Sequence, residues 1–405
     1  MKKQRQFGYS LAIGVLFGLS AALIFTAGFF FRDAVHLAFP TAFAANTASN
    51  IDGYPLVDEV QNLLNQHYLR DQPGYTQRQY AAIRGIMATL EDRYTFFVDP
   101  PVAQSESDAL AGTYGGVGVQ LTRNEKGEFV LFPYDDSPAA AAGIEDGDIL
   151  LAVNGEAVDG TSQQDAIDQR LRGEVKDGNG VELTVLKSNA EEVTQFIEFA
   201  VINIPSVVWR LLVEDSSIGY LQILRFTSRT PEEVVSALES LQENDIQALI
   251  VDMRNNSGGL LQESVDVASQ FLDENMVIVY ENSNNTERIL TASNGGLATD
   301  IPLVVLVNQG TASASELVAG AIQDHGRGTL IGQRTFGKGT VQQIFRLSDD
   351  SSVHITSAEW LTPDQRRLES VGLEPDITMI PDVNGRDVEL GEAIRYLQQQ
   401  PETIR

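Results

Sequence analysis

The sequence contains no cysteine among its 405 residues, which excludes a thiolate nucleophile, a thiolate metal site and any disulfide. Positive charge is also scarce: 28 basic residues stand against 56 acidic ones, and the net charge is −28. A chain this acidic repels phosphate groups, so we expect no nucleic acid partner. Hydrophobic residues make up 43% of the chain, which is enough for the cores of two or three domains.

Lysine is used very sparingly. The chain has six lysines, and Lys338 is the only one after Lys187. Arginine keeps its proton in a protein, whereas a buried lysine can lose its proton and act as a base. Two explanations stay open: a codon preference for arginine spared one lysine by chance, or position 338 needs a side chain that can be neutral.

No cluster of His and carboxylate residues has the spacing of metal ligands, so we predict neither a metal nor a cofactor. The segment Gly332-Gln-Arg-Thr-Phe-Gly-Lys-Gly339 matches the G-x-x-x-x-G-K pattern of a phosphate-binding loop. That loop needs Ser or Thr after the lysine to bind Mg²⁺, but Gly339 follows, and residues 340–345 favour a strand rather than a helix. We therefore reject a nucleotide site.

An uncharged run from Gln6 to Phe31 follows Lys2, Lys3 and Arg5. It is long enough to cross a hydrocarbon core of about 30 Å as a helix, and the basic flank places the N-terminus in the cytoplasm. Ala42-Phe-Ala44 resembles a signal-peptidase site, so cleavage stays open, although we favour a retained anchor. Either way we expect the rest of the chain in the cell envelope, on its extracytoplasmic face.

The pattern along the chain indicates five parts. Residues 1–45 form the basic flank and the anchor or signal peptide, and 46–102 show the apolar spacing of helices. Short strands with two helices fill 103–190, α/β alternation fills 191–380, and a helical tail occupies 381–405. The predicted fold class is an α/β core with an inserted β-rich domain, an N-terminal helical segment and a transmembrane helix.

The part 103–190 resembles a PDZ domain in the permuted form of bacterial proteases. The motifs are Tyr114-Gly-Gly-Val-Gly-Val119, Ser137-Pro-Ala-Ala-Ala-Ala-Gly143 and Val153-Asn-Gly155. The resemblance implies that backbone N–H groups of Gly116, Val117, Gly118 and Val119 hold the C-terminal carboxylate of a peptide, which adds as a strand. It also implies that Arg172 can contact the protease core when a peptide is bound; otherwise Arg172 is an ordinary surface arginine.

Two buried strands, 248–253 and 303–307, each run into a turn of small residues. Ligands of α/β sheets bind at the carboxyl ends of strands, so the Gly258-Gly259 turn and the Thr311–Ser315 turn should meet there. Their N–H groups could jointly form an oxyanion hole.

The second turn offers three hydroxyl nucleophiles next to a helix start, Thr311, Ser313 and Ser315. The residues alone divide the choice evenly between Ser313 and Ser315. Lys338 is the candidate base. His325 lies about three helical turns from the serines, roughly 15 Å along the axis, so we interpret it as structural.

Residues 57–380 resemble the carboxyl-terminal processing proteases, serine peptidases with an inserted PDZ domain. The shared motifs are Asp252-Met-Arg-Asn-Asn-Ser-Gly-Gly259, Gly310-Thr-Ala-Ser-Ala-Ser-Glu316, Gln323-Asp-His325 and Thr335-Phe-Gly-Lys-Gly-Thr-Val-Gln342. The resemblance implies that Ser313 is the nucleophile, Lys338 the base and Gln342 the residue that positions the lysine. It further implies that Ala314 and one of Gly258 and Gly259, favouring Gly259, donate N–H groups to the oxyanion.

We therefore predict a serine endopeptidase that recognises substrate C-termini through its PDZ domain and cleaves nearby with a Ser-Lys dyad. The rival hypothesis is a catalytically silent PDZ scaffold of the cell envelope. The expected partners are proteins or peptides with free C-termini and, through the N-terminal helix, the membrane, while homo-oligomer formation stays open. The residues do not indicate the physiological substrate or the residue preference at the cut.

Overall fold

The computed structural model describes residues 53–399 except Glu125, Asn285 and Asn384. The chain divides into two compact units, residues 1–74 and 75–405. Among the described residues of the first unit, helix α2 (Pro55–His67) begins at a proline and has no buried residue. The second unit contains all other described elements.

The fold-class prediction needs one correction, which concerns the membrane. The predicted span from Gln6 to Phe31 lies outside the described residues, and no helix that the structure describes could cross a bilayer. The longest described helices, α3 (Tyr75–Ala88) and α7 (Thr230–Glu243), have 14 residues. Such a helix is about 21 Å long, short of the roughly 30 Å of a hydrocarbon core. The described residues thus have a mixed α/β fold, and the predicted transmembrane helix is not among their helices.

The main sheet has six strands, in the order β10-β11-β12-β15-β16-β19. In this sheet β11, β12, β15, β16 and β19 run parallel, and β10 pairs antiparallel with β11. All residues of β12 and β15 are buried, as their continuous apolar runs require in a sheet covered on both faces. The strands are β10 (Val207–Leu211), β11 (Ile218–Ile223), β12 (Ala248–Asp252), β15 (Leu303–Val307), β16 (Thr329–Gly332) and β19 (Ile377–Thr378).

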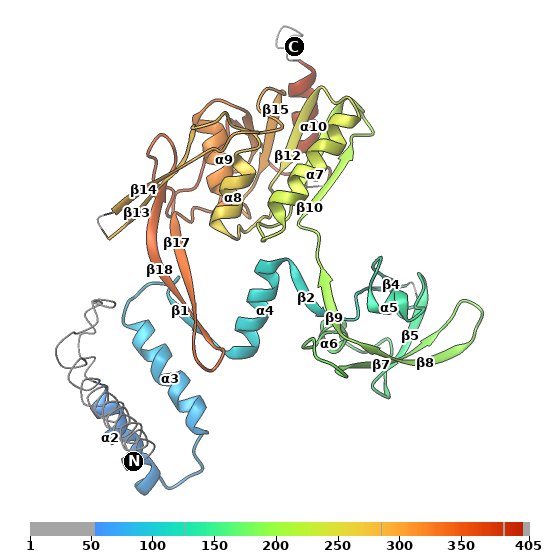
Figure 1. Ribbon diagram of the computed structural model, residues 1–405, viewed down its shortest axis with the longest axis vertical. Helices are drawn as coiled ribbons and strands as arrows, with labels where there is room; N and C mark the ends of the chain where they lie inside the picture. The colour runs from blue at the N-terminus through green and yellow to red at the C-terminus, as the bar shows by residue number, and fades with distance from the viewer. Residues whose placement is uncertain (1–52, 125, 285, 384, 400–405) are drawn as a thin grey trace, which may run out of the picture. The chain divides into compact units, whose positions relative to one another are not determined.

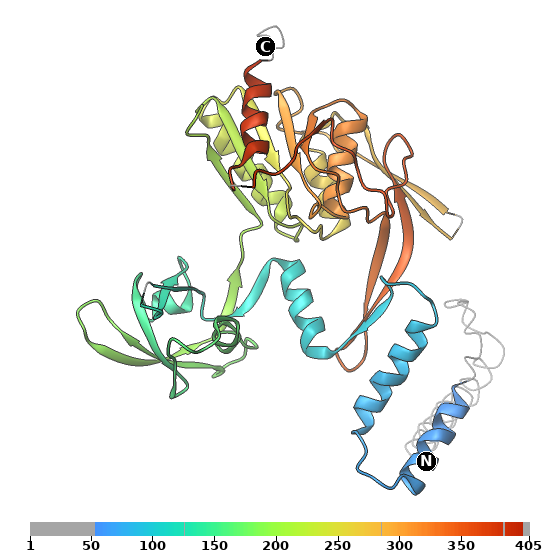
Figure 2. The same cartoon turned by 180° about the vertical axis from the view of Figure 1, so that it is seen from behind.

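Helices cover both faces of this sheet (Figures 1 and 2). Helices α7, α8 (Leu261–Ala268) and α9 (Ala314–Asp324) share one apolar core with Leu249 and Val251. Helix α10 (Val388–Gln398) packs on the opposite face, against Ile250. Successive strand residues point to opposite faces, so each strand feeds both cores.

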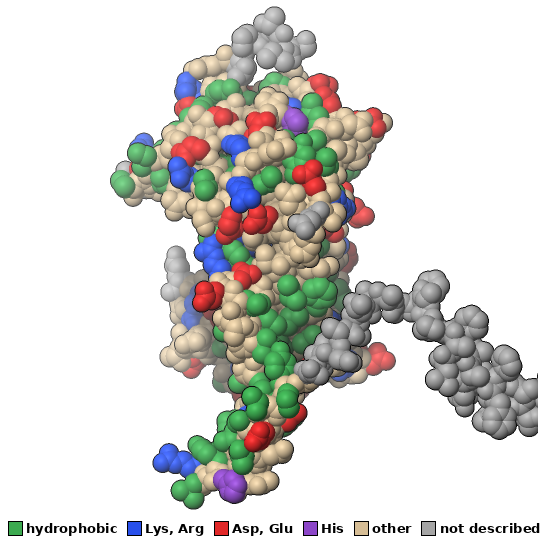
Figure 3. Space-filling model, turned by 90° about the vertical axis from the view of Figure 1, so that its left-hand side faces the viewer, with side chains coloured by type: hydrophobic (Ala, Val, Ile, Leu, Met, Phe, Trp, Pro, Cys, Tyr) green, Lys and Arg blue, Asp and Glu red, His purple; other side chains and the backbone are tan. Residues whose placement is uncertain are grey.

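A second, antiparallel sheet contains β17, the strand that follows the loop with Lys338. Its order is β1-β18-β13-β14, and β17 pairs with β18. The strands are β1 (Phe96–Val98), β13 (Val277–Ser283), β14 (Thr286–Thr291), β17 (Thr340–Arg346) and β18 (Ser352–Leu361), and helix α4 (Pro100–Ala111) follows β1. Phe96, Ile344 and Phe345 on this sheet are exposed. On the face that Figure 3 draws, hydrophobic side chains lie next to one another.

The inserted domain lies between two paired strands, β2 (Thr113–Gly116) and β9 (Ala200–Asn203). Its sheet has the order β3-β4-β5-β7-β8, with the short β6 beside β5. Its core is separate from that of the main sheet and contains Phe129, Leu131 and Leu183. The elements are β3 (Val119–Arg123), β4 (Phe129–Pro133), α5 (Pro138–Ala141), β5 (Asp148–Val153), β6 (Glu156–Ala157), α6 (Gln164–Arg170), β7 (Gly180–Leu186) and β8 (Glu192–Glu198).

Candidate active site

Ser313 lies at the turn between β15 and α9, where it is the N-terminal cap of the helix with φ 57° and ψ −119°. A non-glycine residue with positive φ stores strain of about 1–3 kcal/mol, and such residues cluster at functional sites. The Ser313 N–H donates to Glu316 Oε2 at 2.9 Å, which holds the turn. The next N–H, that of Ala314, belongs to the first helical residue and has no acceptor within the helix.

The structure separates the three candidate hydroxyls. Ser315 and Thr311 are fully buried. Ser315 Oγ donates to the carbonyl oxygen of Asn256, and Thr311 Oγ1 donates to that of Met253, each at 2.9 Å. Ser313 instead lines a cavity of about 250 Å³. Of the three, Ser313 is therefore the hydroxyl that a substrate in this cavity could reach.

Lys338 lines the same cavity. It lies on the loop between β16 and β17, and its Nζ donates to Gln342 Oε1 at 2.5 Å. Nζ also lies 4.9 Å from the centre of the Tyr94 ring, and Gln342 Nε2 donates to the Tyr94 carbonyl oxygen. Within the described chain no hydrogen bond joins Ser313 Oγ to Lys338 Nζ. The structure thus brings both side chains to one cavity while the amine is held by an amide.

The surroundings of Lys338 favour its neutral form. Burial lowers the pKa of the amine, Glu369 opposes this shift, and Arg93 reinforces it. Glu369 does not form a salt bridge with the lysine: its Oε2 accepts the Gly339 N–H at 2.9 Å, and its Oε1 lies 3.3 Å from Arg93 Nη2. A lysine with a lowered pKa has a larger neutral fraction at neutral pH, as a general base requires.

Glu316 connects the turn that contains Ser313 to the loop that contains Lys338. Its side chain is fully buried and accepts four hydrogen bonds. Oε2 accepts the N–H groups of Ser313 and Lys338, both at 2.9 Å. Oε1 accepts the Thr335 hydroxyl at 2.5 Å and the Gly337 N–H at 2.7 Å. One carboxylate therefore fixes the backbones of the nucleophile and the base relative to each other.

The Gly258-Gly259 turn lies against the nucleophile. A Cβ on Gly258 would lie 3.0 Å from Ser313 Cβ, and one on Gly259, where φ is 147°, would lie 1.9 Å from the Phe226 carbonyl oxygen. Only glycine fits such an approach without a backbone shift. The Gly258 N–H donates to Asn256 Oδ1 at 2.9 Å, whereas Gly259 lines the cavity beside Ser313. Of the two glycines, Gly259 is the better placed to donate to a bound substrate.

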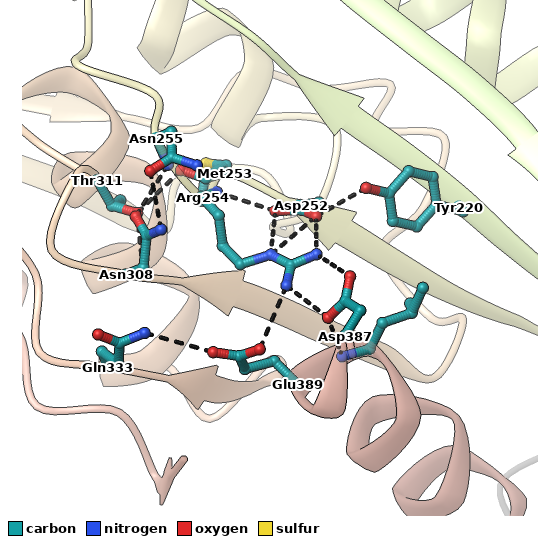
Figure 4. Close-up of polar contacts among 11 residues, drawn as sticks. Tyr220, Asp252, Met253, Arg254, Asn255, Asn308, Thr311, Gln333, Asp387 and Glu389 are labelled. Carbon is teal, nitrogen blue, oxygen red and sulfur yellow. Dashed lines mark hydrogen bonds and ion pairs between the residues drawn. The ribbon is translucent and has the colours of Figure 1, made fainter. Parts of the chain in front are cut away.

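Side-chain amides join the two turns (Figure 4). Asn308 Oδ1 accepts the Asn255 N–H at 2.9 Å, and Asn308 Nδ2 donates to Asn255 Oδ1 at 3.0 Å. The Ala312 N–H donates to the Asn256 carbonyl oxygen at 3.0 Å. The predicted oxyanion residues and Ser313 are thus parts of one hydrogen-bonded assembly. Over the residues described, no three His, Asp or Glu side chains come together as metal ligands would.

The inserted domain has a groove of its own, a cavity of about 250 Å³ beside β3 and α6. Val117, Gly118, Val119 and Arg172 line it. Gly116 does not, although its backbone pairs with that of Arg172. The Arg172 guanidinium lies 4.3 Å from the centre of the Tyr114 ring, which also lines the groove, and burial raises the pKa of the Tyr114 hydroxyl to about 12.

His325 lies at the other end of α9, where Nε2 is 2.7 Å from the Val277 carbonyl oxygen. An 11-residue helix is about 16 Å long, so His325 does not reach Ser313. Its interpretation as a structural residue agrees with this contact.

Comparison with known proteins identifies both parts of the chain. Residues 217–379 match the family model of peptidase family S41, and residues 130–176 match that of the PDZ domain. Over 321 residues the chain is 36% identical to the carboxyl-terminal-processing protease of Synechocystis, an alignment that covers 78% of this chain and 74% of the relative. The chain belongs to the carboxyl-terminal processing proteases.

The chain is also similar to a second curated protein and to two solved structures. The chloroplastic C-terminal processing peptidase of Tetradesmus obliquus is 33% identical over 343 residues, which are 80% of this chain and 73% of that protein. Among solved structures, the photosystem II D1 C-terminal processing protease is 31% identical, with a TM-score of 0.49 over 83% of this chain and 90% of that one. A Bacteroides fragilis structure described as an S41 protease shares the fold, with 15% identity and a TM-score of 0.50 over 86% and 98% of the two chains.

The predicted family and its PDZ domain are thus confirmed, and the protein is a serine protease of this family. Three residues near Lys338 escaped the sequence analysis: Tyr94, Glu316 and Glu369. Glu316 stands three residues after Ser313, the spacing of a capping box, and that signal could have found it. Tyr94 and Glu369 lie far from Lys338 in the chain, in segments without a local signal for the site.

Proposed function

We propose that this carboxyl-terminal processing protease cleaves proteins near their C-termini with Ser313 as nucleophile and Lys338 as general base. The observation that carries the proposal is the shared cavity: Ser313 and Lys338 line the same space, and the half-buried lysine is held by the amide of Gln342 rather than by an acid. An amide accepts a hydrogen bond from the amine without stabilising its charged form as a carboxylate would.

In this mechanism the neutral amine of Lys338 takes the proton of Ser313 Oγ while Oγ attacks the scissile carbonyl carbon. The negative charge that develops on the carbonyl oxygen is held by the N–H groups of Ala314 and Gly259. The protonated lysine then gives its proton to the leaving amine. A water molecule, deprotonated by the same lysine, then attacks the acyl carbon. The bond to Ser313 Oγ breaks, Oγ regains a proton from the lysine, and the shortened protein leaves with a new carboxylate.

The groove of the PDZ domain supplies the recognition step. The Gly118 and Val119 end of the predicted turn would hold the carboxylate of a substrate, because Gly116 does not line the groove and the Val117 N–H already donates to the Leu171 carbonyl oxygen at 3.1 Å. The peptide would add as a strand beside β3. The positive φ of Gly118, 76°, is a conformation that turns backbone N–H groups toward an anion. Substrates whose C-terminus is amidated should therefore bind more weakly, with a higher KM, than the same substrates with a free carboxylate.

The nucleophile is tested with an unfolded reporter protein that ends in a flexible tail. Ser313→Ala should lower kcat by at least about 10³-fold, as the loss of a serine nucleophile does in other proteases. Ser315→Ala, which removes the neighbouring buried hydroxyl, should keep the reaction within about tenfold of wild type. Cleavage by Ser313→Ala at the wild-type rate would exclude Ser313 as the nucleophile, whereas no cleavage by the wild-type protein would support a binding protein without catalysis.

A further inference from the structure

Helix α10 begins beside the carboxyl end of β12 (Figure 4). Asp387 and Glu389, at its start, approach Arg254. Arg254 lies two residues after Asp252, the last residue of β12, in the loop that leads to Gly258 and Gly259. The S41 family model ends at residue 379, so α10 lies beyond the matched domain. The helix therefore adds contacts to the catalytic loops from outside that domain.

The contacts to Arg254 have the geometry of strong ion pairs. Arg254 Nη1 and Nη2 donate to the two carboxylate oxygens of Asp387, at 2.7 and 2.8 Å. On its other side the same guanidinium donates to Asp252, from Nε at 3.0 Å and from Nη2 at 2.6 Å to Oδ2. Two parallel hydrogen bonds between a guanidinium and a carboxylate fix orientation as well as distance.

The three side chains differ in how far they are buried, and their hydrogen bonds keep Arg254 and Asp387 charged. Only 1% of the Asp252 side chain and 16% of the Arg254 side chain are exposed, against 42% for Asp387. Burial disfavours the charge on Arg254, but hydrogen bonds with Asp387 and Asp252 raise the pKa of the guanidinium nonetheless. Burial likewise opposes ionisation of Asp387, while its hydrogen bonds with Arg254 and the Leu390 N–H lower its pKa. Both groups are therefore charged at neutral pH.

Glu389 extends the contact to the loop of the base. Its Oε2 lies 3.6 Å from Arg254 Nη1, and its Oε1 accepts a hydrogen bond from Gln333 Nε2 at 3.3 Å. The Gln333 N–H donates to the Val307 carbonyl oxygen at 3.0 Å, where the loop toward Lys338 begins. The start of α10 thus contacts both the loop that leads to Gly258 and Gly259 and the loop that leads to Lys338.

We propose that Asp387 is a positioning residue of the protease, which acts through Arg254 to hold the loop of Gly258 and Gly259 in place against Ser313. The inference rests on the proposed function, because an oxyanion site must be in register with the nucleophile. A displacement of about 1 Å at such a site can lower the rate by about 100-fold.

Asp387 has a second role, which the test must separate from the first. Its Oδ1 accepts the Leu390 N–H at 3.0 Å and so caps α10. Asparagine caps a helix as well as aspartate does but carries no charge for Arg254. Glutamate keeps the charge but is not among the favoured N-terminal caps. Asp387→Asn therefore removes the ion pair and keeps the cap, and Asp387→Glu does the reverse.

The experiment measures kcat, KM and the thermal midpoint of the full chain with the tailed reporter. Asp387→Asn should lower kcat by about 10- to 100-fold, leave KM within about twofold and keep the midpoint within a few degrees. Asp387→Glu should keep most of kcat and lose thermal stability instead. Glu392→Gln is the matched control, since Glu392 lies on the same helix and pairs only with Arg395 among the charged groups described.

Hydrogen–deuterium exchange gives a readout that needs no substrate. The amides of residues 255–259 should exchange faster in Asp387→Asn than in wild type or Glu392→Gln. This inference would be overturned if Asp387→Asn kept the kcat and the exchange rates of wild type. The proposed function would still stand in that case, provided that Ser313→Ala is inactive. The inference would also be overturned if both Asp387→Asn and Asp387→Glu lost the same fraction of kcat, in proportion to the fall in their thermal midpoints. An active Ser313→Ala would instead refute the proposed function itself.

Discussion

Replacing Gln342 by glutamate tests the electrostatic environment of the base, and it also removes the hydrogen bond that Gln342 Nε2 donates to the Tyr94 carbonyl oxygen. The substitution preserves the length of the side chain and exchanges a neutral acceptor for a charged one, 2.5 Å from Lys338 Nζ. If Lys338 must be neutral to accept the proton of Ser313, a carboxylate at this position should keep it protonated. The enzyme should then lose activity at neutral pH and recover it at higher pH.

The size of the effect follows from the distance between the two groups. At 2.5 Å, Coulomb's law with an effective dielectric constant of about 20 gives about 7 kcal/mol. Solvent screening of the partly exposed amine reduces this value, and opposite charges at short range shift a pKa by about 1–3 units. Each unit lowers the neutral fraction about tenfold, so kcat/KM near neutral pH should fall about 10- to 1000-fold.

The assay is the pH dependence of kcat/KM with the tailed reporter, measured for Gln342→Glu, for the control Gln343→Glu and for wild type. The acid limb of the profile should move to higher pH in Gln342→Glu by the same 1–3 units, with activity approaching that of wild type above it. Gln343→Glu, which adds the same charge at the exposed neighbouring position of β17, should leave the limb in place. Identical profiles for Gln342→Glu and Gln343→Glu would refute the reasoning.

Three further substitutions test neighbouring contacts. Glu369→Gln should move the acid limb to lower pH, because Glu369 raises the pKa of Lys338 and its amide can still accept the Gly339 N–H; a limb that stays in place would contradict this. Glu316→Gln should lower the free energy of unfolding by about 1–3 kcal/mol in a denaturant titration, because its amide N–H₂ would face N–H donors; an unchanged midpoint would contradict the four-bond assignment. Gly259→Ala should lower kcat at least about tenfold, because its Cβ would lie 1.9 Å from the Phe226 carbonyl oxygen and the turn would have to shift; wild-type kcat would show that the turn adapts.

The local architecture of the site could be predicted from the sequence. A continuous apolar run followed by small residues predicted the strand and the helix start around Ser313, and the structure has β15 and α9 at these positions. The choice between Ser313 and Ser315 could not be made from the pattern, because both flank the same helix start. It depends on which hydroxyl meets the Asn256 carbonyl oxygen, and that is a contact between distant segments.

The contacts that surround the base were not predictable in the same way. Tyr94 reaches Lys338 because β1 and β17 both pair with β18, a register that no local pattern specifies. Residues 381–405 were predicted to form a helical tail, and their helical spacing gave no sign that Asp387 would meet Arg254. Such pairs follow from the tertiary packing of α10 on the main sheet rather than from neighbouring residues.

The most direct test of the central claim, that Lys338 is the base for Ser313, is kcat of Lys338→Ala with the tailed reporter from about pH 6 to about pH 10. Lys176→Ala, which removes an exposed lysine of the inserted domain, is the control. We predict that Lys338→Ala loses about 10²- to 10⁴-fold in kcat across this range, as the loss of a general base does, while Lys176→Ala matches wild type. A Lys338→Ala protein that cleaves the reporter at the wild-type rate, with the wild-type acid limb, would contradict the account.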